Sequence, residues 1–312
     1  MKKRFLAMVL SIACAFSLVM AFEFAMPKTS FARELKDIDM YLIAGQSNAA
    51  GYSYHNGTLT ETFSNVGYAG ETDLSRHTNV ASSSNVDSFA DYYWEVKAGY
   101  GRSSDRIGPE YGIAKELNSS YTKDNPAFIF KSAAGGTSLR DLATSGSDSY
   151  GNWQPRSLWG EGYTPNNGDP TGLQYYNFVE NFKTVYNQLK ANGYSPIVKG
   201  MAWMQGCDDI AYPNEYQELL ETFINDIRVD LAGITGDQGL FVMPFVIGKI
   251  PTSFSQYNNP LVPAFNEAQQ AVANKLPGVE TVETADLIIV NPDGSVNGVD
   301  QYHFSLRTLP NL

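Results

Sequence analysis

A series of short apolar runs, each ending in glycine or polar residues, constrains the fold of this chain more than any other feature. The first run, Met40–Ala44, has no polar face and stops at Gly45, which is typical of a strand buried on both sides of a parallel sheet. Similar runs predict further strands at Ala127–Lys131, Ile197–Met204 and Leu240–Ile247, and a short fifth strand at Thr281–Thr284.

Amphipathic stretches separate these runs. Gly108-Pro109-Glu110 opens a short helix that runs through Leu117, with the carboxylate near the positive end of the helix dipole. Apolar residues spaced by three and four predict three more helices, at Phe178–Leu189, Tyr216–Leu231 and Phe265–Lys275. Strands that alternate with helices indicate an α/β fold, in which a parallel sheet lies between helices on both faces.

Residues 49–106 show little periodicity and are rich in Asn, Ser, Gly and Tyr. A long connection without regular structure is usually a binding loop or a disordered insertion in a compact domain. The aromatic residues favour an ordered loop, and their faces suit flat sugar rings. Local packing is nevertheless the ordinary role of any single tyrosine in such a segment.

Residues 1–32 have the three parts of a secretory signal peptide. Basic residues 2–4 precede the apolar stretch Phe5–Phe22, and Ser30-Phe31-Ala32 provides a small-x-small cleavage site. Cleavage after Ala21 and retention as a membrane anchor are the alternatives. We expect a secreted protein with one domain over residues 33–312, long enough for a substantial core.

The charge of the chain disfavours two classes of partner. The net charge is −11, and residues 1–32 carry four positive charges and one negative charge, so the mature chain has a net charge of −14. Such a surface repels nucleic acid and anionic membranes. No later apolar run is long enough to cross a bilayer. We expect neither nucleic acid nor, after removal of the signal, a membrane as a partner.

Cysteine and histidine are scarce. Only Cys207 remains after processing, which excludes an internal disulfide. This cysteine and the three histidines, His55, His77 and His303, fit no structural zinc pattern. We expect no metal site and no cofactor.

Three of the predicted strands end in residues that suit catalysis. Ser47 follows the first strand, Gly135-Gly136 follows the second, and Gln205-Gly206 follows the third. The carboxyl ends of parallel strands meet at one edge of a sheet, where open α/β folds place their chemistry. The structural alternative for the serine is an ordinary helix N-cap.

Asp300 and His303 add a candidate acid and base far along the chain. Their spacing of three residues places both on one face of a helical turn. A carboxylate in that position can orient the imidazole while its other nitrogen faces a nucleophilic hydroxyl. A surface turn is the structural alternative for this pair.

Five short motifs, taken in order, resemble those of a known family of esterases. They are G-Q-S-N from Gly45, G-P-E from Gly108, G-G-T from Gly135, W-x-Q-G-x-x-D from Trp203 and D-x-x-H-F-S from Asp300. From about Asp39 to its C-terminus the chain resembles the SGNH hydrolases. The specific branch is that of the sialate O-acetylesterases and acetylxylan esterases, carbohydrate esterase family six.

The resemblance implies a three-layer α/β/α sandwich with a flavodoxin-like strand order, and it assigns the catalytic roles. Ser47 would be the nucleophile, His303 the general base and then acid, and Asp300 the carboxylate that orients the imidazole. The family acts on O-acetyl groups of sialic acids, xylan or related glycans, without a metal or an organic cofactor.

The same resemblance implies an oxyanion hole. Its donors would be the backbone N–H of Ser47, a backbone N–H of the Gly135-Gly136 turn and the side chain of Gln205. We also expect three neighbouring residues of these motifs to contact the substrate; they are Gln46, Asn48 and Asp209.

Two features depart from the family pattern. The family usually has glutamate where Cys207 stands, and Asp208 is the candidate to compensate for that charge. The acidic neighbours oppose thiolate formation, which disfavours Cys207 as a nucleophile of its own. The chain also ends nine residues after His303, where relatives usually continue into a closing helix, so we expect a shortened C-terminal end.

The sequence therefore favours a secreted serine esterase that removes acetyl groups from carbohydrates through an acetyl-enzyme. A glycan-binding pseudoenzyme on the same fold, inactive through Cys207 or the short tail, is the first alternative. A generic lipase-like esterase is the second, and the polar, tyrosine-rich loop favours sugars over acyl chains.

Overall fold

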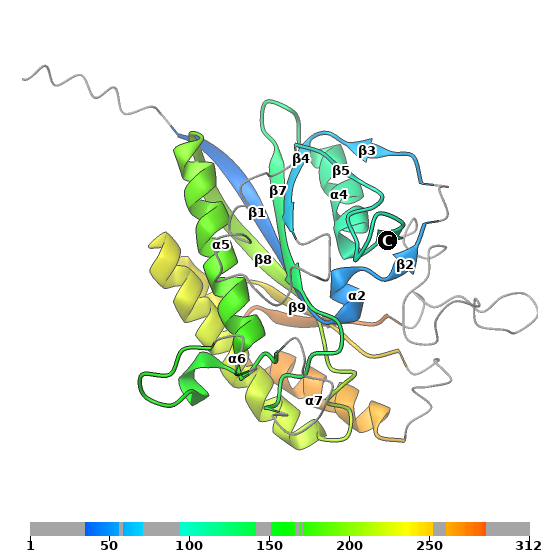
Figure 1. Ribbon diagram of the computed structural model, residues 1–312, viewed down its shortest axis with the longest axis vertical. Helices are drawn as coiled ribbons and strands as arrows, with labels where there is room; N and C mark the ends of the chain where they lie inside the picture. Colours follow the sequence, from blue (N-terminus) through cyan, green and yellow to red (C-terminus); the bar gives the residue numbers. More distant parts are fainter. Residues whose placement is uncertain are drawn as a thin grey trace, which may run out of the picture. The chain divides into compact units, whose positions relative to one another are not determined.

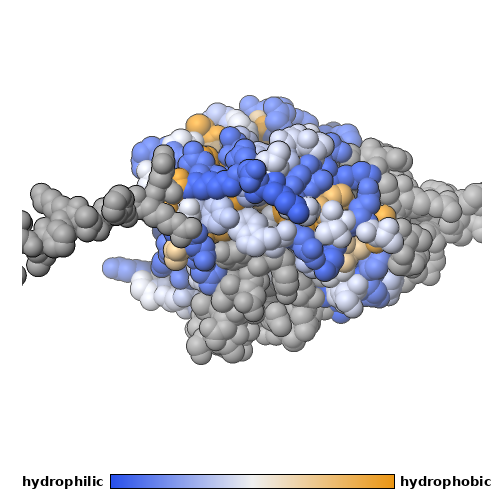
Figure 2. Space-filling model, turned by 90° about the horizontal axis from the view of Figure 1, so that it is seen from above, coloured by the Kyte–Doolittle hydropathy of each residue, from blue (hydrophilic) through white to orange (hydrophobic). Residues whose placement is uncertain are grey.

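The computed structural model describes residues 35–55, 59–70, 94–141, 151–165, 169, 171–251 and 260–284. The expected signal peptide and the two expected catalytic residues Asp300 and His303 lie outside these ranges. None of the helices described combines the length and the hydrophobicity needed to cross a membrane. Hydrophilic residues dominate the face seen in Figure 2, where hydrophobic residues form small separate patches.

Six parallel strands form the central sheet of the described chain (Figure 1). Their spatial order is β10 (Val279–Val282), β9 (Phe245–Gly248), β8 (Tyr194–Met204), β1 (Lys36–Gly45), β7 (Ala127–Ala133) and β4 (Val66–Gly70). The five strands from β7 to β10 follow the flavodoxin-like order, as expected. The strand order reverses at β1, which lies between β7 and β8. Such a switch point is where open α/β sheets bind ligands, at the carboxyl ends of the strands.

The strand β4 corrects the expectation that residues 49–106 contain no regular structure. It pairs with β7 from Val66↔Ala127 to Gly70↔Lys131 and extends the sheet at one edge. Two short antiparallel pairs also belong to this region: β2 (Ser53–Tyr54) with β6 (Arg106–Ile107), and β3 (Thr62–Phe63) with β5 (Val96–Lys97).

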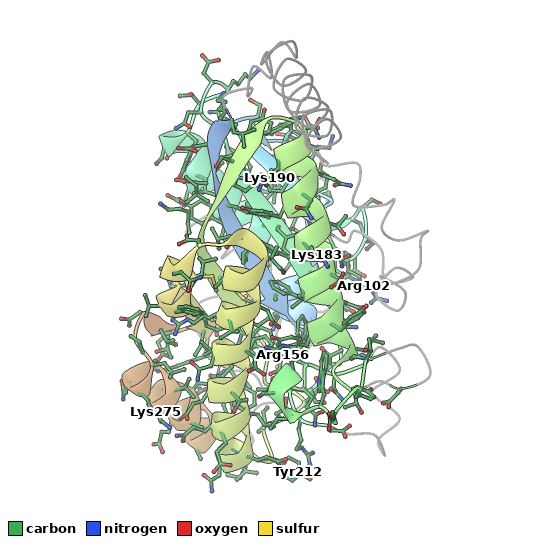
Figure 3. The ribbon with its side chains drawn as sticks, turned by 90° about the vertical axis from the view of Figure 1, so that its left-hand side faces the viewer. Arg102, Arg156, Lys183, Lys190, Tyr212 and Lys275 are labelled. Carbon is green, nitrogen blue, oxygen red and sulfur yellow. The ribbon has the colours of Figure 1, made fainter. Side chains whose placement is uncertain are left out.

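The helices cover both faces of the sheet. One face carries α5 (Leu173–Ala191), α6 (Pro213–Thr235) and α7 (Val262–Lys275), and the other carries α4 (Pro109–Ser120) and the one-turn helix α2 (Ser47–Ala50). In Figure 3, α5 lies beside α6 over the sheet and bears the labelled residues Lys183 and Lys190. All four predicted helices are confirmed; α5 with 19 residues and α6 with 23 residues extend beyond their predicted bounds at both ends.

Alternate residues of the central strands enter two separate cores. In β7, Phe128 and Phe130 pack with the side chains of α5, while Ile129 and Ala133 pack with those of α4. All seven residues of β7 are buried. This burial on both faces explains the continuous apolar run and confirms the three-layer α/β/α sandwich.

The fourth predicted strand begins later than its sequence indicated. Residues Gln238–Val242 form a 3₁₀ helix, and β9 starts only at Phe245. The Asp237 side chain accepts a hydrogen bond of 2.8 Å from the backbone N–H of Gly239 and so caps this helix. Phe241 is 47% exposed, so its apolar side chain does not mark a buried strand.

Candidate active site

Ser47 lies directly after the central strand β1, at the switch point of the sheet. Gly45, the last residue of β1, has φ +134°, and a Cβ there would lie 2.3 Å from the carbonyl oxygen of Met204. Only glycine allows this close approach. The backbone N–H of Gln46 then donates to the same carbonyl at 2.9 Å, so β8 fixes the turn that leads to the serine.

The serine begins α2, which has a single turn. Its two helical hydrogen bonds run from Ala50 N to Gln46 O and from Gly51 N to Ser47 O, both at 2.9 Å. Ser47 is 8% exposed. Among the described residues, neither its hydroxyl nor its backbone N–H has a hydrogen-bond partner. Both groups lie at the amino end of a helix, where negative charge is favoured.

The loop after β7 lies beside this turn. The N–H of Ala134 donates to the carbonyl of Gly45 at 3.1 Å, and the Thr137 hydroxyl donates to Ala134 O at 2.7 Å. Gly136 has φ +69°, which favours glycine. Within the described part of the chain, the N–H groups of Gly135 and Gly136 have no acceptor. The predicted backbone donors thus lie on neighbouring strand ends.

The side chain of Gln205 follows β8 and is 3% exposed. Its Nε2 donates to Asp209 Oδ2 at 2.6 Å and to Thr137 O at 3.0 Å, which uses both amide hydrogens. Its Oε1 is buried, with no hydrogen-bond partner among the described residues. In this arrangement Gln205 ties the turn after β8 to the loop after β7, and its role as an oxyanion donor stays a prediction.

The side chain of Gln46, the residue before the serine, also joins two strand ends, those of β1 and β8. Its Oε1 accepts hydrogen bonds of 2.9 Å from the backbone N–H groups of Gly206 and Cys207, and its Nε2 donates to Asp208 Oδ2 at 3.1 Å. The side chain is 3% exposed. The structure thus gives Gln46 a positioning role, while substrate contact by Gln46, Asn48 and Asp209 stays a prediction.

Two adjacent carboxylic acids, Asp208 and Asp209, are hydrogen-bonded to the side chains of Gln46 and Gln205. Burial raises the pKa of Asp209 to about 6, opposed by hydrogen bonds from Leu139 N–H and Gln205. Burial also raises the pKa of Asp208, opposed by the hydrogen bond from Gln46. The site therefore holds two acids whose charged forms are disfavoured by desolvation and favoured by amide donors.

The expected base and its carboxylate, His303 and Asp300, lie outside the described residues, as does His77. His55 is described, and its Nε2 lies 3.0 Å from the carbonyl oxygen of Ser104. No cluster of three or more His, Cys, Asp or Glu residues suited to a metal ion occurs in the described ranges.

Sequence reasoning missed an ion pair behind the serine. Lys131 and Glu110 are 1% and 0% exposed, and Lys131 Nζ lies 2.8 Å from Glu110 Oε2. The lysine belongs to a strand that is apolar apart from this residue and Ser132, and the glutamate was expected only to interact with a helix dipole. The signal that could have revealed this pair is a charged residue within a buried strand, because such a residue is almost never fully buried without a partner.

Two cavities reach the site. A small one is lined by Gln46, Asn48, Gln205, Cys207 and Lys249, among others. A larger groove of about 340 Å³ runs between α4 and the strands β8 to β10, and it reaches Asn48. The side chains that line it are mainly apolar, among them Tyr41, Ile113, Leu117, Met204, Val246 and Val282.

Comparisons with known proteins found one family model and several similar folds. The family model for carbohydrate esterases described as sialic acid-specific acetylesterases matches residues 37–307. No curated protein sequence matches the chain. The crystal structure of NanS has a TM-score of 0.58 and 14% identity over 88% of this chain and 93% of that one. A protein from Arabidopsis thaliana has a TM-score of 0.53 and 17% identity over 88% of this chain and 94% of that one.

Proposed function

The chain belongs to the carbohydrate esterases of the sialic acid-specific acetylesterase family, and on this premise we propose that it removes O-acetyl groups from carbohydrates by covalent catalysis at Ser47. One observation carries the proposal. Ser47 follows the central strand at the switch point of the sheet, and its hydroxyl and N–H have no partner in the described structure. The backbone N–H groups of Gly135 and Gly136 lie on the neighbouring strand end.

The proposed reaction has two steps. His303 accepts the proton of the Ser47 hydroxyl as the oxygen attacks the acetyl carbonyl, and Asp300 orients the imidazole and stabilises its charged form. The negative charge on the former carbonyl oxygen is met by the N–H groups of Ser47 and of the Gly135-Gly136 turn. Gln205 becomes a third donor when one hydrogen of its Nε2 turns from Thr137 O to the oxyanion. The sugar hydroxyl leaves with a proton from His303, and water then releases acetate from the serine.

We further propose that the protein acts outside the cell, after removal of residues 1–32. Its substrates would be acetylated xylan, acetylated sialic acids or related glycans. The family match supports the carbohydrate acetyl ester, and the basic and apolar segments of the N-terminus support secretion.

The test is acetate release by the purified chain of residues 33–312. Acetylated xylan, O-acetylated sialic acid and 4-nitrophenyl acetate are compared, with Ser47→Ala as the matched control. We expect turnover on at least one glycan and a loss in kcat on the order of 10⁴- to 10⁶-fold in Ser47→Ala, with unchanged folding. Turnover by Ser47→Ala would overturn the mechanism, and binding of acetylated glycan without turnover by the wild type would identify a pseudoenzyme.

The apolar groove that reaches Asn48 favours a second candidate, an esterase for longer acyl chains. A volume of about 340 Å³ lies in the range of small-ligand pockets. A series of 4-nitrophenyl esters from acetate to octanoate separates the two functions. We expect kcat/KM to fall with chain length for a carbohydrate acetylesterase, whereas a rise beyond butyrate would support the second candidate.

A further inference from the structure

The buried ion pair of Lys131 and Glu110 lies directly behind the helix that carries the proposed nucleophile. Lys131 Nζ donates to three acceptors: Ala50 O at 3.0 Å, Tyr100 O at 2.7 Å and Glu110 Oε2 at 2.8 Å. Glu110 Oε1 accepts from the backbone N–H of Gly108 at 2.7 Å. One ammonium group therefore joins the end of α2, the segment before β6 and the start of α4.

This pair lies in a core that is otherwise apolar. Its neighbours are buried hydrophobic residues on the α4 side of the sheet, among them Ile43, Ala49, Ala50, Tyr68, Ile107, Tyr111 and Ala133. Desolvation of two charges opposes folding, and well-packed apolar residues in place of a buried pair are often neutral or stabilising. Stability alone therefore does not account for an ion pair at this position.

The helix α2 needs an external anchor. It is four residues long, its N-cap residue Gln46 makes no capping hydrogen bond with its side chain, and its first turn contains no acidic residue. A single turn in isolation is unstable, because nucleation fixes several residues for one hydrogen bond. Gly51 then leaves the helix with φ +92°, and a Cβ on it would lie 2.7 Å from the backbone nitrogen of Gly108.

The ammonium of Lys131 binds the carboxyl end of α2. Ala50 is the last helical residue, and its carbonyl is one that no helical hydrogen bond satisfies. A cation at the carboxyl end also interacts favourably with the helix dipole. Lys131 extends from β7, which pairs with β1 in the register Ile43↔Lys131, so the anchor belongs to the rigid sheet.

We propose that Lys131 and Glu110 are positioning residues for catalysis, which hold α2 so that the Ser47 hydroxyl and N–H keep their places beside the Gly135-Gly136 turn. The inference rests on the proposed function of Ser47. Lys131 supplies the hydrogen bond to Ala50, and Glu110 holds the ammonium in place while it also binds the N–H of Gly108. Neither side chain touches the substrate.

The decisive variant is Lys131→Met with Glu110→Gln, which removes both charges at nearly constant volume. We expect it to fold with a melting temperature near that of the wild type, because no unpaired charge remains buried. Its kcat for 4-nitrophenyl acetate should fall on the order of 10- to 100-fold with KM nearly unchanged, because small displacements of a nucleophile have effects of this size. Titration with diethyl 4-nitrophenyl phosphate counts the folded serine sites, so kcat is expressed per site.

The matched control is Arg228→Met. Arg228 is also a buried cation that donates to backbone carbonyls, those of Met243 and Pro277, but it lies on α6 behind the opposite face of the sheet. We expect this variant to lower the melting temperature and to leave kcat per site unchanged. It separates a general loss of stability from the displacement of α2.

Glu110→Gln alone provides a second test if the double variant does not fold. It leaves the Lys131 ammonium without its carboxylate partner, so we expect kcat per site to fall, by a smaller factor than in the double variant, together with the melting temperature. Wild-type kcat in the double variant or, where that variant does not fold, in Glu110→Gln would overturn the positioning role, as would a loss beyond about tenfold in the Arg228→Met control. An absence of Ser47-dependent turnover in the wild type would overturn the proposed function itself, and the positioning role with it.

Discussion

The carboxylate of Asp209 accepts a hydrogen bond of 2.6 Å from Gln205 Nε2, and the two side chains are 1% and 3% exposed. The same oxygen of Asp209 accepts a bond of 2.8 Å from the backbone N–H of Leu139. Because Leu139 belongs to the loop after β7, the aspartate joins the strand ends on both sides of Ser47. Two segments that are distant in sequence, the loop after β7 and the turn after β8, thus share one buried acid.

This burial predicts a dependence of stability on pH. The pKa of Asp209 rises from 3.8 in the unfolded chain to about 6 in the folded protein, mainly through desolvation. Between these values the folded state holds a proton that the unfolded state has lost, so stability falls as the pH rises. Each pKa unit corresponds to about 1.4 kcal/mol, which gives a loss of about 3 kcal/mol between about pH 4 and pH 7.

The measurement is the free energy of unfolding in urea at several pH values, for the wild type and for Asp209→Asn. We expect the wild type to lose stability relative to the variant as the pH rises, because asparagine does not titrate. Asp208 is present in both proteins, so its own raised pKa largely cancels in the difference. A difference that does not change between about pH 4 and pH 7 would contradict the raised pKa.

The role of Gln205 can be tested separately from its bond to Asp209. Gln205→Ala removes the proposed third oxyanion donor and should lower kcat by roughly 10²- to 10³-fold. Asp209→Asn keeps Gln205 but removes the charged acceptor, so it serves as the matched control. If Gln205 acts only through the loop, Gln205→Ala would change the melting temperature and leave kcat per folded site intact.

Much of the fold was predictable, because its central strands are buried on both faces and read as apolar runs. The strand β4 was not, since Val66–Gly70 contains two glycines and no such run. Gly67 leaves room for the ring of Phe128 on the neighbouring strand β7, as a Cβ there would lie 2.6 Å from that ring. At Phe241 the prediction failed in the opposite way, because a strand was predicted where none exists. The side chain is hydrophobic but exposed, and the residue belongs to a 3₁₀ helix that precedes β9.

The site was predictable where a single motif fixes it. The sequence placed Ser47 after a buried strand, because glycine and small residues follow an apolar run directly. It did not show that Gln46 holds the turn after β8, because the partners Gly206 and Asp208 lie far away along the chain. The pairing of Lys131 with Glu110 depends on the same kind of distant contact, and neither residue type alone indicates it.

The assignment of the general base leads to a prediction about the three histidines. His303→Ala should lower kcat by several orders of magnitude, because the serine hydroxyl then has no proton acceptor. His55→Ala and His77→Ala are the controls, and they should change KM at most. His55 in particular is occupied with the carbonyl of Ser104. Activity that survives the loss of His303 and disappears with His77 would overturn the proposed triad.

The last prediction concerns Cys207, where the chain departs from its family. The backbone N–H of Cys207 donates to Gln46 Oε1 at 2.9 Å, a contact that does not depend on the side chain. We therefore expect Cys207→Ser to keep nearly full kcat on 4-nitrophenyl acetate.

Cys207→Glu restores the carboxylate that is usual in the family, and we expect a modest gain in kcat over a weak wild-type esterase. The neighbouring Asp208 limits this gain, because its pKa is already raised by burial and a second charge beside it would raise it further. A neutral or harmful effect would show that Asp208 supplies the charge on its own. An inactive Cys207→Ser together with an active Ser47→Ala would make the thiol the nucleophile and would refute the serine mechanism.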